Sequence, residues 1–213
     1  MTFISDALIK LGAVPDPNQP IQDPIKWKCV FIIGPAGSGK STICNQLYLK
    51  HLEFVIVDPD DMKVKNPEYD PEDPQPIHEW SKLLSEKKFI ETVTNKCGTP
   101  MLVEATGKSW DNVARKIWLA QALGYTTYLV YVEAPLEVSI HRNRLRGCSG
   151  DRYVDENIVL EQNKNVQHSV EQLKTIVDKY LKVRKYTKRD LAEAKASVAK
   201  YPPPLKQNPL CAK

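Results

Sequence analysis

The stretch that decides the fold is Gly34-Pro35-Ala36-Gly37-Ser38-Gly39-Lys40-Ser41-Thr42. It fits the pattern G-x-x-x-x-G-K-[ST], in which glycines let the backbone turn its amides inward around phosphate oxygens. The apolar run before it, residues 27–33, is rich in Val and Ile and indicates a buried strand, whereas residues 40–50 indicate a helix. A strand, a glycine-rich turn and a helix N-terminus in this order predict a phosphate cradle, because the helix end adds positive potential.

The residue types of this P-loop predict separate roles within it. Lys40 is expected to neutralise the charge of the β- and γ-phosphates, and the Ser41 hydroxyl is expected to ligate Mg²⁺. ATP and Mg²⁺ are therefore the expected cofactors. The residues expected to bind the nucleotide are Gly34, Pro35, Ala36, Gly37, Ser38, Gly39, Lys40, Ser41 and Thr42.

Apolar segments alternate with helical patterns beyond the P-loop. Further strands are predicted at residues 54–57, 101–103 and 128–132, with a proline-rich acidic loop at 59–76 and a long helical pattern reaching from Val166 to Tyr180. Residues 181–186 fit either a helix or an edge strand. This order predicts an α/β protein with the three-layer α/β/α fold of P-loop NTPases and a central, mostly parallel sheet.

Several residues are expected to cap the predicted helices. Ser109 is a candidate N-cap and Gly124 a candidate C-cap of the helix between them. Pro135 fits the first position of the following helix. Thr187 and Asp190 have the spacing of a capping box for a final lysine-rich helix.

The composition is that of an ordinary globular protein. The chain has 213 residues, with 42% hydrophobic and 26% charged residues, which suits one α/β domain with additions. The net charge of +4 favours anionic ligands such as nucleotides but is too small to indicate nucleic acid by itself. The chain shows no signal peptide and no apolar run of the ~20 residues that a membrane span needs. We therefore expect a cytoplasmic protein without membrane contact.

The five cysteines are scattered and form no Cys-x-x-Cys pair. This spacing predicts reduced thiols and argues against metal binding by cysteine.

Two P-loop classes fit the sequence poorly. A GTPase would carry Asn-Lys-x-Asp, and the two Asn-Lys pairs, at residues 95–96 and 163–164, lack the aspartate. A motor or AAA-type ATPase is usually longer and has an acidic pair after an apolar strand, whereas only Glu104 follows the strand at 101–103. A kinase is the class that remains.

Carboxylates follow two of the predicted strands. The second strand ends at Asp58-Pro59-Asp60-Asp61, where Asp60 is expected to accept the proton of an acceptor hydroxyl and Asp58 to hold the metal. The alternative is an Asx turn with helix caps. The third strand ends at Glu104-Ala105-Thr106, and Glu104, Thr106 and Asp61 are the expected substrate-binding residues, although an ordinary turn is an equal alternative. Because ligands bind at the carboxyl ends of parallel strands, Gly34, Asp58, Glu104 and Glu133 should share one sheet edge.

Four arginines, Arg142, Arg144, Arg146 and Arg152, flank Gly147 and Gly150. Phosphoryl transfer needs positive charge on the moving phosphate, which arginine supplies in a fixed fork. Arg146 and Arg152 are the predicted catalytic pair, together with Lys40 and Asp60. The other arginines are expected on a solvated helix face.

Together these segments resemble the zeta-toxin family of P-loop kinases, whose fold group also contains polynucleotide and shikimate-type kinases. The resemblance covers roughly residues 30–173 and rests on the P-loop, on residues 55–63, on residues 102–108 and on Arg146 with Arg152. It implies that Asp60 is the base, that both arginines contact ATP phosphates, and that Glu104 and Thr106 lie in the substrate site. It also implies a nucleotide sugar such as UDP-N-acetylglucosamine as acceptor. The chain has Glu-Ala-Thr-Gly where the family usually has Glu-Gly-Thr-Gly.

The predicted organisation is an N-terminal extension at 1–24, a P-loop kinase domain at 25–186, and a basic helix with a proline-rich tail at 187–213. Two alternatives to a small-molecule kinase remain. One is a polynucleotide 5′-hydroxyl kinase, since lysines and arginines at 174–189 could follow a phosphate backbone, although a solvated helix face explains them better. The other is a non-catalytic ATP-binding module. The sequence identifies neither the acceptor nor a protein partner.

Overall fold

The computed structural model describes residues 7, 9–13, 27–50, 53–70, 76–95, 97–149 and 153–200. Within these residues lies one five-stranded sheet with the order β2-β3-β1-β4-β5, and every neighbouring pair of strands is parallel. The strands are β1 (Lys28–Ile33), β2 (Val55–Val57), β3 (Met101–Ala105), β4 (Thr126–Glu133) and β5 (Lys179–Arg184). The predicted parallel sheet is confirmed, and it is parallel throughout the described residues.

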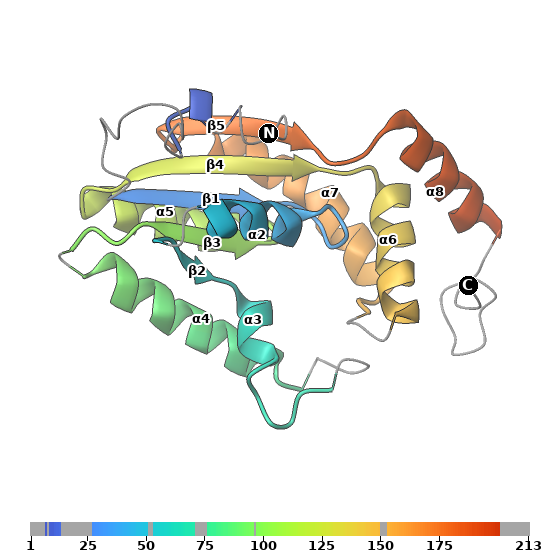
Figure 1. Cartoon of the computed structure of the whole chain (residues 1–213), viewed down its shortest axis with the longest axis horizontal. Helices are drawn as coiled ribbons and strands as arrows, with labels where there is room; N and C mark the ends of the chain where they lie inside the picture. Colours follow the sequence, from blue (N-terminus) through green and yellow to red (C-terminus); the bar gives the residue numbers. More distant parts are fainter. Residues whose placement is uncertain are drawn as a thin grey trace.

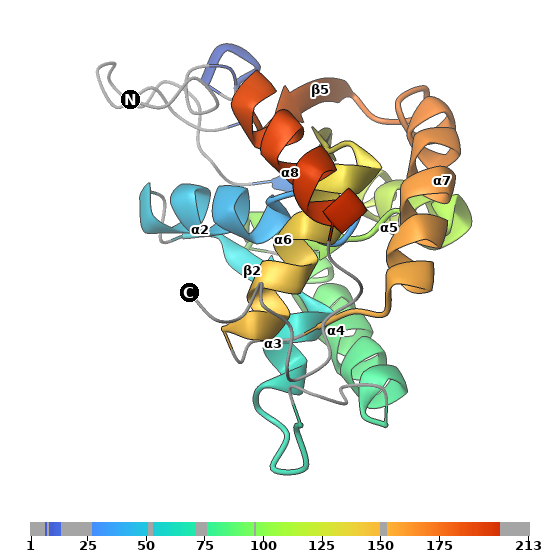
Figure 2. The ribbon, with the colours of Figure 1, turned by 90° about the vertical axis from the view of Figure 1, so that its right-hand side faces the viewer.

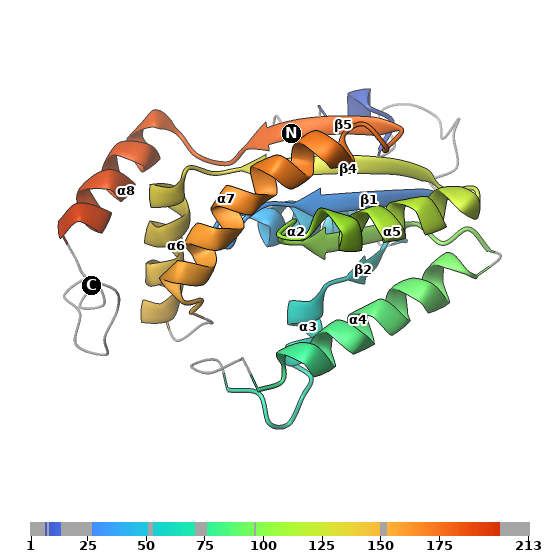
Figure 3. The ribbon, with the colours of Figure 1, turned by 180° about the vertical axis from the view of Figure 1, so that it is seen from behind.

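Helices cover both faces of the sheet. They are α2 (Lys40–Lys50), α3 (Pro59–Lys63), α4 (His78–Val93), α5 (Trp110–Ala122), α6 (Leu136–Cys148), α7 (Glu156–Leu173) and α8 (Lys188–Lys200). Helix α2 lies on one face, and α4, α5 and α7 lie on the other (Figures 2 and 3). Helices α6 and α8 stand beyond the carboxyl ends of the strands, on the side to which the arrowheads point (Figure 1). This is the predicted three-layer α/β/α fold.

The central strand β1 supplies side chains to two cores, one on each face. Phe31 and Ile33 join the core beneath α4, α5 and α7, whereas Val30 and Ile32 join the core beneath α2. This alternation follows from the two-residue period of a strand. All six residues of β1 are buried, as expected for the centre of a parallel sheet covered on both sides.

A short N-terminal segment packs against the second of these cores. Ala13 is fully buried among its side chains. The Lys28 ammonium donates to the Gly12 carbonyl at 2.8 Å, as does the Tyr128 hydroxyl at 3.1 Å. Lys179 donates to the Leu11 carbonyl at 2.7 Å. The described part of the predicted N-terminal extension therefore lies against the P-loop domain.

Most of the predicted helix boundaries are confirmed. Ser109 is the N-cap residue of α5, and Gly124, at a φ of 89°, follows its C-cap. Thr187 and Asp190 form the predicted capping box, since each accepts a hydrogen bond from the other's backbone amide. Pro135 is the N-cap residue of α6 and not its first helical residue.

Two predictions about local structure are corrected, and one alternative that the sequence leaves open is settled. Residues 59–63, predicted as loop, form α3 because Asp58 caps the helix and Pro59 is preorganised for its first turn. Helix α7 ends at Leu173, so the helical pattern does not extend to Tyr180. Residues 179–184, left open between helix and strand at 181–186, form the edge strand β5.

The cysteines are in mixed states. Cys29 and Cys44 are buried free thiols, and Cys97 is an exposed one. Cys148 is disulfide-bonded, so the prediction of reduced thiols is wrong for this residue.

Within the described parts of the chain, no helix combines the length and the apolar character needed to cross a bilayer.

Candidate active site

The P-loop connects β1 to α2 and is packed tightly against α6 and β4. Gly37 has a φ of 74°, and a Cβ atom there would lie 2.5 Å from the Ser139 carbonyl oxygen. A Cβ atom on Gly34 would lie 2.5 Å from the Val132 carbonyl oxygen. Both positions therefore require glycine, for close approach and in Gly37 also for backbone conformation.

Lys40 and Ser41, the two predicted phosphate and metal residues, meet Glu104 of the neighbouring strand. The Lys40 ammonium donates to the Pro35 carbonyl at 3.0 Å and lies 4.0 Å from Glu104 Oε1. The Ser41 hydroxyl donates to the same Oε1 atom at 3.0 Å. The structure thus brings the P-loop and the predicted substrate-site carboxylate into contact.

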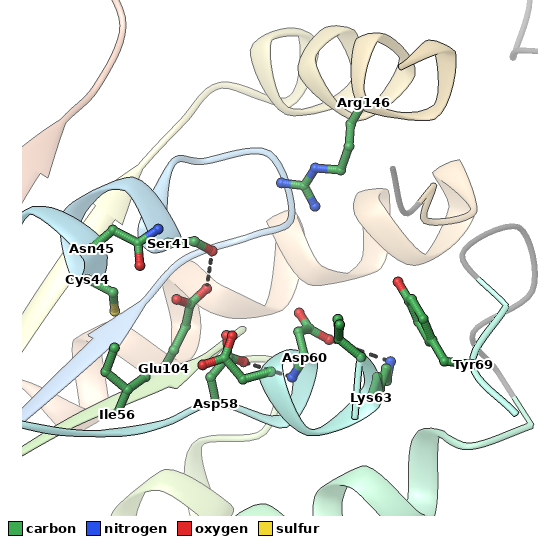
Figure 4. A pocket seen from close by; sticks show the side chains of 12 residues that line it. Ser41, Cys44, Asn45, Ile56, Asp58, Asp60, Lys63, Tyr69, Glu104 and Arg146 are labelled. Atoms are coloured by element: carbon green, nitrogen blue, oxygen red, sulfur yellow. Dashed lines mark hydrogen bonds and ion pairs between the residues drawn. The ribbon is translucent and has the colours of Figure 1, made fainter. Parts of the chain in front are cut away.

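Beside this contact lies a cavity of about 230 Å³ (Figure 4). Asp60 and Lys63 lie on the α3 side of it, whereas Ser41 and Asn45 come from α2 and Arg146 points in from α6 (Figure 4). Its lining residues are Ser41, Cys44, Asn45, Ile56, Asp58, Asp60, Asp61, Lys63, Val64, Tyr69, Glu104 and Arg146. Four of them are carboxylates and two are cations, which gives the cavity an acidic wall.

The Asp58 carboxylate caps α3 by accepting a hydrogen bond of 2.9 Å from the Asp60 amide. The helix-cap interpretation of this turn is therefore confirmed for Asp58, which also lines the cavity, and its role toward a metal stays a prediction. Burial raises the pKa of Asp58 to about 8, and the negative charges of Glu104 and Asp60 add to this effect. Asp60 itself extends toward solvent, with 42% of its side chain exposed, and lies 3.5 Å from the buried Lys63 ammonium.

This crowding of negative charge provides the test of the predicted magnesium site. The Ser41 hydroxyl lies next to the buried Glu104 carboxylate, and Asp58, a second buried carboxyl on the cavity wall, has a pKa raised by burial because its charge is unfavourable there. No group of three or more His, Cys, Asp or Glu side chains in the described residues could hold a metal on its own. Mg²⁺ suits such a site, since it usually takes one or two protein ligands and completes its shell with phosphates and water.

The arginines divide differently from the prediction. Arg146 lines the cavity, as its predicted role requires. Arg144 is buried and pairs with Glu156 at 2.6 Å, so it holds α6 to α7 and is not on a solvated face. Arg142, also expected on the solvated face, lies 3.4 Å from the Gly37 carbonyl oxygen and donates to the Lys185 carbonyl. Arg152 and Gly150 lie outside the described residues.

The remaining predicted site residues lie apart from the cavity wall or in the P-loop itself. Thr106 does not line the cavity, and its hydroxyl accepts a hydrogen bond of 3.4 Å from the Lys108 amide. Thr42 is exposed on α2, whereas Ser38 is fully buried. Glu133, expected at the same sheet edge, pairs with Lys182 and Arg184 of β5 at 2.5 Å each.

Sequence reasoning missed several residues at the site. Asn45 lies one helical turn after Ser41, and Lys63 lies one turn after Asp60, so helical spacing could have suggested both. Tyr69 comes from the segment that was predicted as loop. Gln162 of α7 accepts a hydrogen bond of 3.0 Å from the Ala36 amide, and no local pattern signals a contact between residues 126 positions apart.

Solved structures with a similar fold include three kinds of assembly. A chain of the PezAT chromosomal toxin–antitoxin system of Streptococcus pneumoniae has a TM-score of 0.61 and 16% identity, covering 85% of this chain and 76% of its own. A chain of the AvrRxo1-ORF1:AvrRxo1-ORF2 complex with sulphate ions has a TM-score of 0.62 and 16% identity, and the match covers 76% of this chain and 56% of that one. A chain of the Pnkp1/Rnl/Hen1 RNA repair complex has a TM-score of 0.55 and 17% identity, and the match covers 72% of this chain and 49% of that one. The chain thus spans about half the length of the last two.

At these identities the likenesses show the α/β fold alone, which agrees with the fold that the sequence predicts. No curated protein matches the sequence.

The family follows from the sequence itself. A family model described as "AAA domain" matches residues 29–171, from β1 into the last turn of α7, which is more than half of the chain. The match concerns the P-loop domain and assigns no ATPase activity, so it leaves the argument from the single carboxylate Glu104 as it stands. The chain belongs to this AAA domain family of P-loop proteins.

Proposed function

We propose that the protein is a Mg·ATP-dependent kinase that transfers the γ-phosphoryl group to a hydroxyl of a small polar acceptor. The observation that carries this proposal is the cavity beside Ser41, which has carboxylates on its α3 side and Arg146 opposite them (Figure 4). A phosphate cradle next to a carboxylate-lined cavity suits transfer between two bound molecules.

The residues divide the chemistry as follows. The P-loop amides and Lys40 hold the phosphates of ATP, and Ser41 would hold Mg²⁺ with Glu104 and Asp58 behind it. Bound Mg²⁺ supplies neutralising charge on the phosphates. Asp60 takes the proton of the acceptor hydroxyl while the oxygen of that hydroxyl bonds to the γ-phosphorus. The bond between the γ-phosphorus and the bridging oxygen breaks, and ADP leaves with this oxygen. Arg146 stabilises the charge on the moving phosphoryl group.

Cavity size favours a small acceptor or the hydroxyl-bearing end of a larger one. The volume of about 230 Å³ is below the ~300–1,000 Å³ typical of sites that enclose drug-sized ligands. The sugar part of a nucleotide sugar, the acceptor implied by the family resemblance, is therefore one candidate.

The basic C-terminal segment gives little support to a polynucleotide kinase. Lys182 and Arg184 share the single carboxylate of Glu133, and Lys174 pairs with Glu171. Cations already paired in this way release few counterions from a phosphate backbone.

An acceptor screen with γ-labelled ATP tests the proposal. UDP-sugars, nucleosides, simple sugars and 5′-hydroxyl oligonucleotides would be offered to the wild type and to Asp60→Asn. We expect one acceptor class to become labelled, and Asp60→Asn to lower kcat about 10²- to 10⁴-fold while ATP affinity stays within about twofold. Glu68→Gln, an exposed carboxyl outside the cavity lining, is the matched control.

Each other outcome has a clear meaning. Label that appears in inorganic phosphate alone indicates an ATPase and overturns the kinase proposal. ATP binding without any transfer or hydrolysis indicates a nucleotide-binding module. Labelled oligonucleotides would identify a polynucleotide kinase, and unchanged transfer by Asp60→Asn would show that another group is the base.

A further inference from the structure

One peptide unit of the P-loop is held at both of its ends by side chains. The Pro35 carbonyl oxygen accepts a hydrogen bond of 3.0 Å from the Lys40 ammonium. The Ala36 amide, which belongs to the same peptide unit, donates a hydrogen bond of 3.0 Å to Gln162 Oε1. Both hydrogen bonds are buried. Because a peptide unit is planar, its two ends turn together, and each bond constrains the other.

The position of Gln162 is itself fixed by packing. It lies on α7, which covers one face of the sheet (Figure 3), and only 8% of it is exposed. Its neighbour Asn163 donates to the Ala134 carbonyl at 3.1 Å, which ties the same turn of α7 to the connection between β4 and α6. Val166, one turn further along, is buried in the core. The Gln162 side chain therefore reaches the P-loop from a rigid support.

A different orientation of the Pro35–Ala36 peptide would have two costs. The Ala36 amide would lose its acceptor in a buried place, and an unpaired buried donor is unfavourable. The Pro35 carbonyl would turn away from both of its donors, the Lys40 ammonium at 3.0 Å and the Ser38 amide at 3.2 Å. Lys40 would then start from a different position when a nucleotide arrives.

We propose that Gln162 is a positioning residue for Lys40 and acts on it through the Pro35–Ala36 peptide. The inference rests on the proposed function, because it concerns the lysine that holds the phosphates of ATP. Gln162 accepts the hydrogen bond of the Ala36 amide, and the Pro35 carbonyl of the same peptide also accepts from the Ser38 amide at 3.2 Å. The P-loop is thus set in its working shape by α7 before nucleotide binds.

Three variants on α7 separate hydrogen bonding from space filling. Gln162→Met keeps the length and approximate volume of the side chain but removes the acceptor oxygen. Gln162→Glu keeps an acceptor oxygen at the same reach. Gln167→Met is the control, because it makes the same Gln-to-Met substitution at an exposed position of the same helix.

The first measurement is hydrogen exchange of the Ala36 amide in the nucleotide-free protein, followed by NMR. We expect exchange to accelerate about two- to tenfold in Gln162→Met, in line with the loss of one hydrogen bond, and to stay slow in Gln162→Glu and Gln167→Met. Wild-type exchange in Gln162→Met would overturn the proposal. Equally fast exchange in Gln162→Glu would overturn it too, because it would show a role in packing alone.

The second measurement is binding of a fluorescent ADP analogue together with ATP kinetics. Gln162→Met should weaken ADP binding about two- to tenfold and raise the KM for ATP by a similar factor. Unchanged affinity would show that Lys40 does not depend on Gln162. Neither the exchange nor the ADP measurement needs an acceptor, so a failed acceptor screen would contradict the kinase proposal and leave this result standing.

Discussion

The Ser41 hydroxyl donates a hydrogen bond of 3.0 Å to Glu104, and this contact joins the first turn of α2 to strand β3. The register of the sheet makes it possible, since Glu104 lies opposite Ile32, two residues before the P-loop begins. Glu104 is 7% exposed and also lies 4.0 Å from Lys40. A single carboxylate thus organises both the predicted metal ligand and the predicted phosphate ligand.

Replacing Glu104 by Gln should weaken the use of magnesium. The variant keeps an acceptor for Ser41 but removes the charge behind it, and changes next to metal ligands typically cost about 10- to 100-fold in metal affinity. When Mg²⁺ is titrated at a fixed ATP concentration, the Mg²⁺ concentration that gives half-maximal activity should rise about 10- to 100-fold. Glu133→Gln makes the same change at the end of β4, where Glu133 faces β5 cations, and should leave the magnesium titration unchanged. Equal titrations for all three proteins would refute the role of Glu104.

Gly37→Ala should abolish nucleotide binding because the added methyl group would lie 2.5 Å from the Ser139 carbonyl oxygen. Gly124→Ala is a matched control, since Gly124 also has a positive φ, 89°, but a Cβ atom there meets nothing within 4 Å. Both variants should lose about 1 kcal/mol of stability to backbone strain. ADP titration should detect a loss of affinity in Gly37→Ala alone. Comparable affinity in the two variants would mean that the loop relaxes around the new methyl group.

The stability of the metal-free protein should fall as pH rises toward 8. Asp58 has its pKa raised to about 8, so the folded chain keeps a proton that the unfolded chain releases near pH 4. The free energy of unfolding therefore decreases between these values, by at most about 1.4 kcal/mol per pH unit. Asp58→Asn should reduce this slope in urea titrations with EDTA between pH 5 and 8.

Asp155→Asn is the control for this pH dependence. Asp155 caps α7 as Asp58 caps α3, but its side chain is exposed. Asparagine is a good N-cap residue, so neither variant should lose its helix. A slope that Asp58→Asn leaves unaltered would show that other groups bind the proton.

Arg144→Met should destabilise the fold without touching the cavity. The guanidinium makes two hydrogen bonds to Glu156, at 2.6 and 2.9 Å, and is almost fully buried. Removing one partner of a buried pair costs about 3 kcal/mol or more, which for a chain of this size lowers Tm by roughly 6–12 °C. Arg115→Met removes an exposed pair of similar distance, with Asp111 at 2.9 Å, and should cost at most about 1 kcal/mol. Equal melting temperatures for the two variants would contradict this ranking.

The parts of the fold that depend on local pattern could be predicted from the sequence. The P-loop with its flanking strand and helix is one example, because its glycines, Lys40 and Ser41 lie together in the chain. The Thr187 and Asp190 capping box is another. Helix α3 was missed because Asp-Pro-Asp-Asp is also common in turns, although Asp58 and Pro59 are a proper helix start. Strand β5 stayed ambiguous because its burial alternates only weakly at the sheet edge.

The contacts that shape the P-loop from outside could not be predicted. Gln162 and Arg142 touch it from α7 and α6, and these contacts depend on how the two helices cross the ends of the strands. In the sequence of a helix, a polar residue that faces solvent cannot be distinguished from one that contacts a loop. Arg144 illustrates the point, since its sequence context suggested a solvated face and the structure buries it against Glu156.

The packing of α8 on α6 bears on how the protein matures on the ribosome. Leu191 and Ala194 of α8 pack against Val138, His141 bonds to Ser197 at 2.9 Å, and the Lys185 carbonyl just before α8 accepts from Arg142. The P-loop emerges early in synthesis, but these partners of α6 emerge more than 100 residues later. A nascent chain can form the first strands and the loop while the support of Arg142 is still missing. Competence to bind nucleotide should therefore appear late during translation, after α8 has left the exit tunnel.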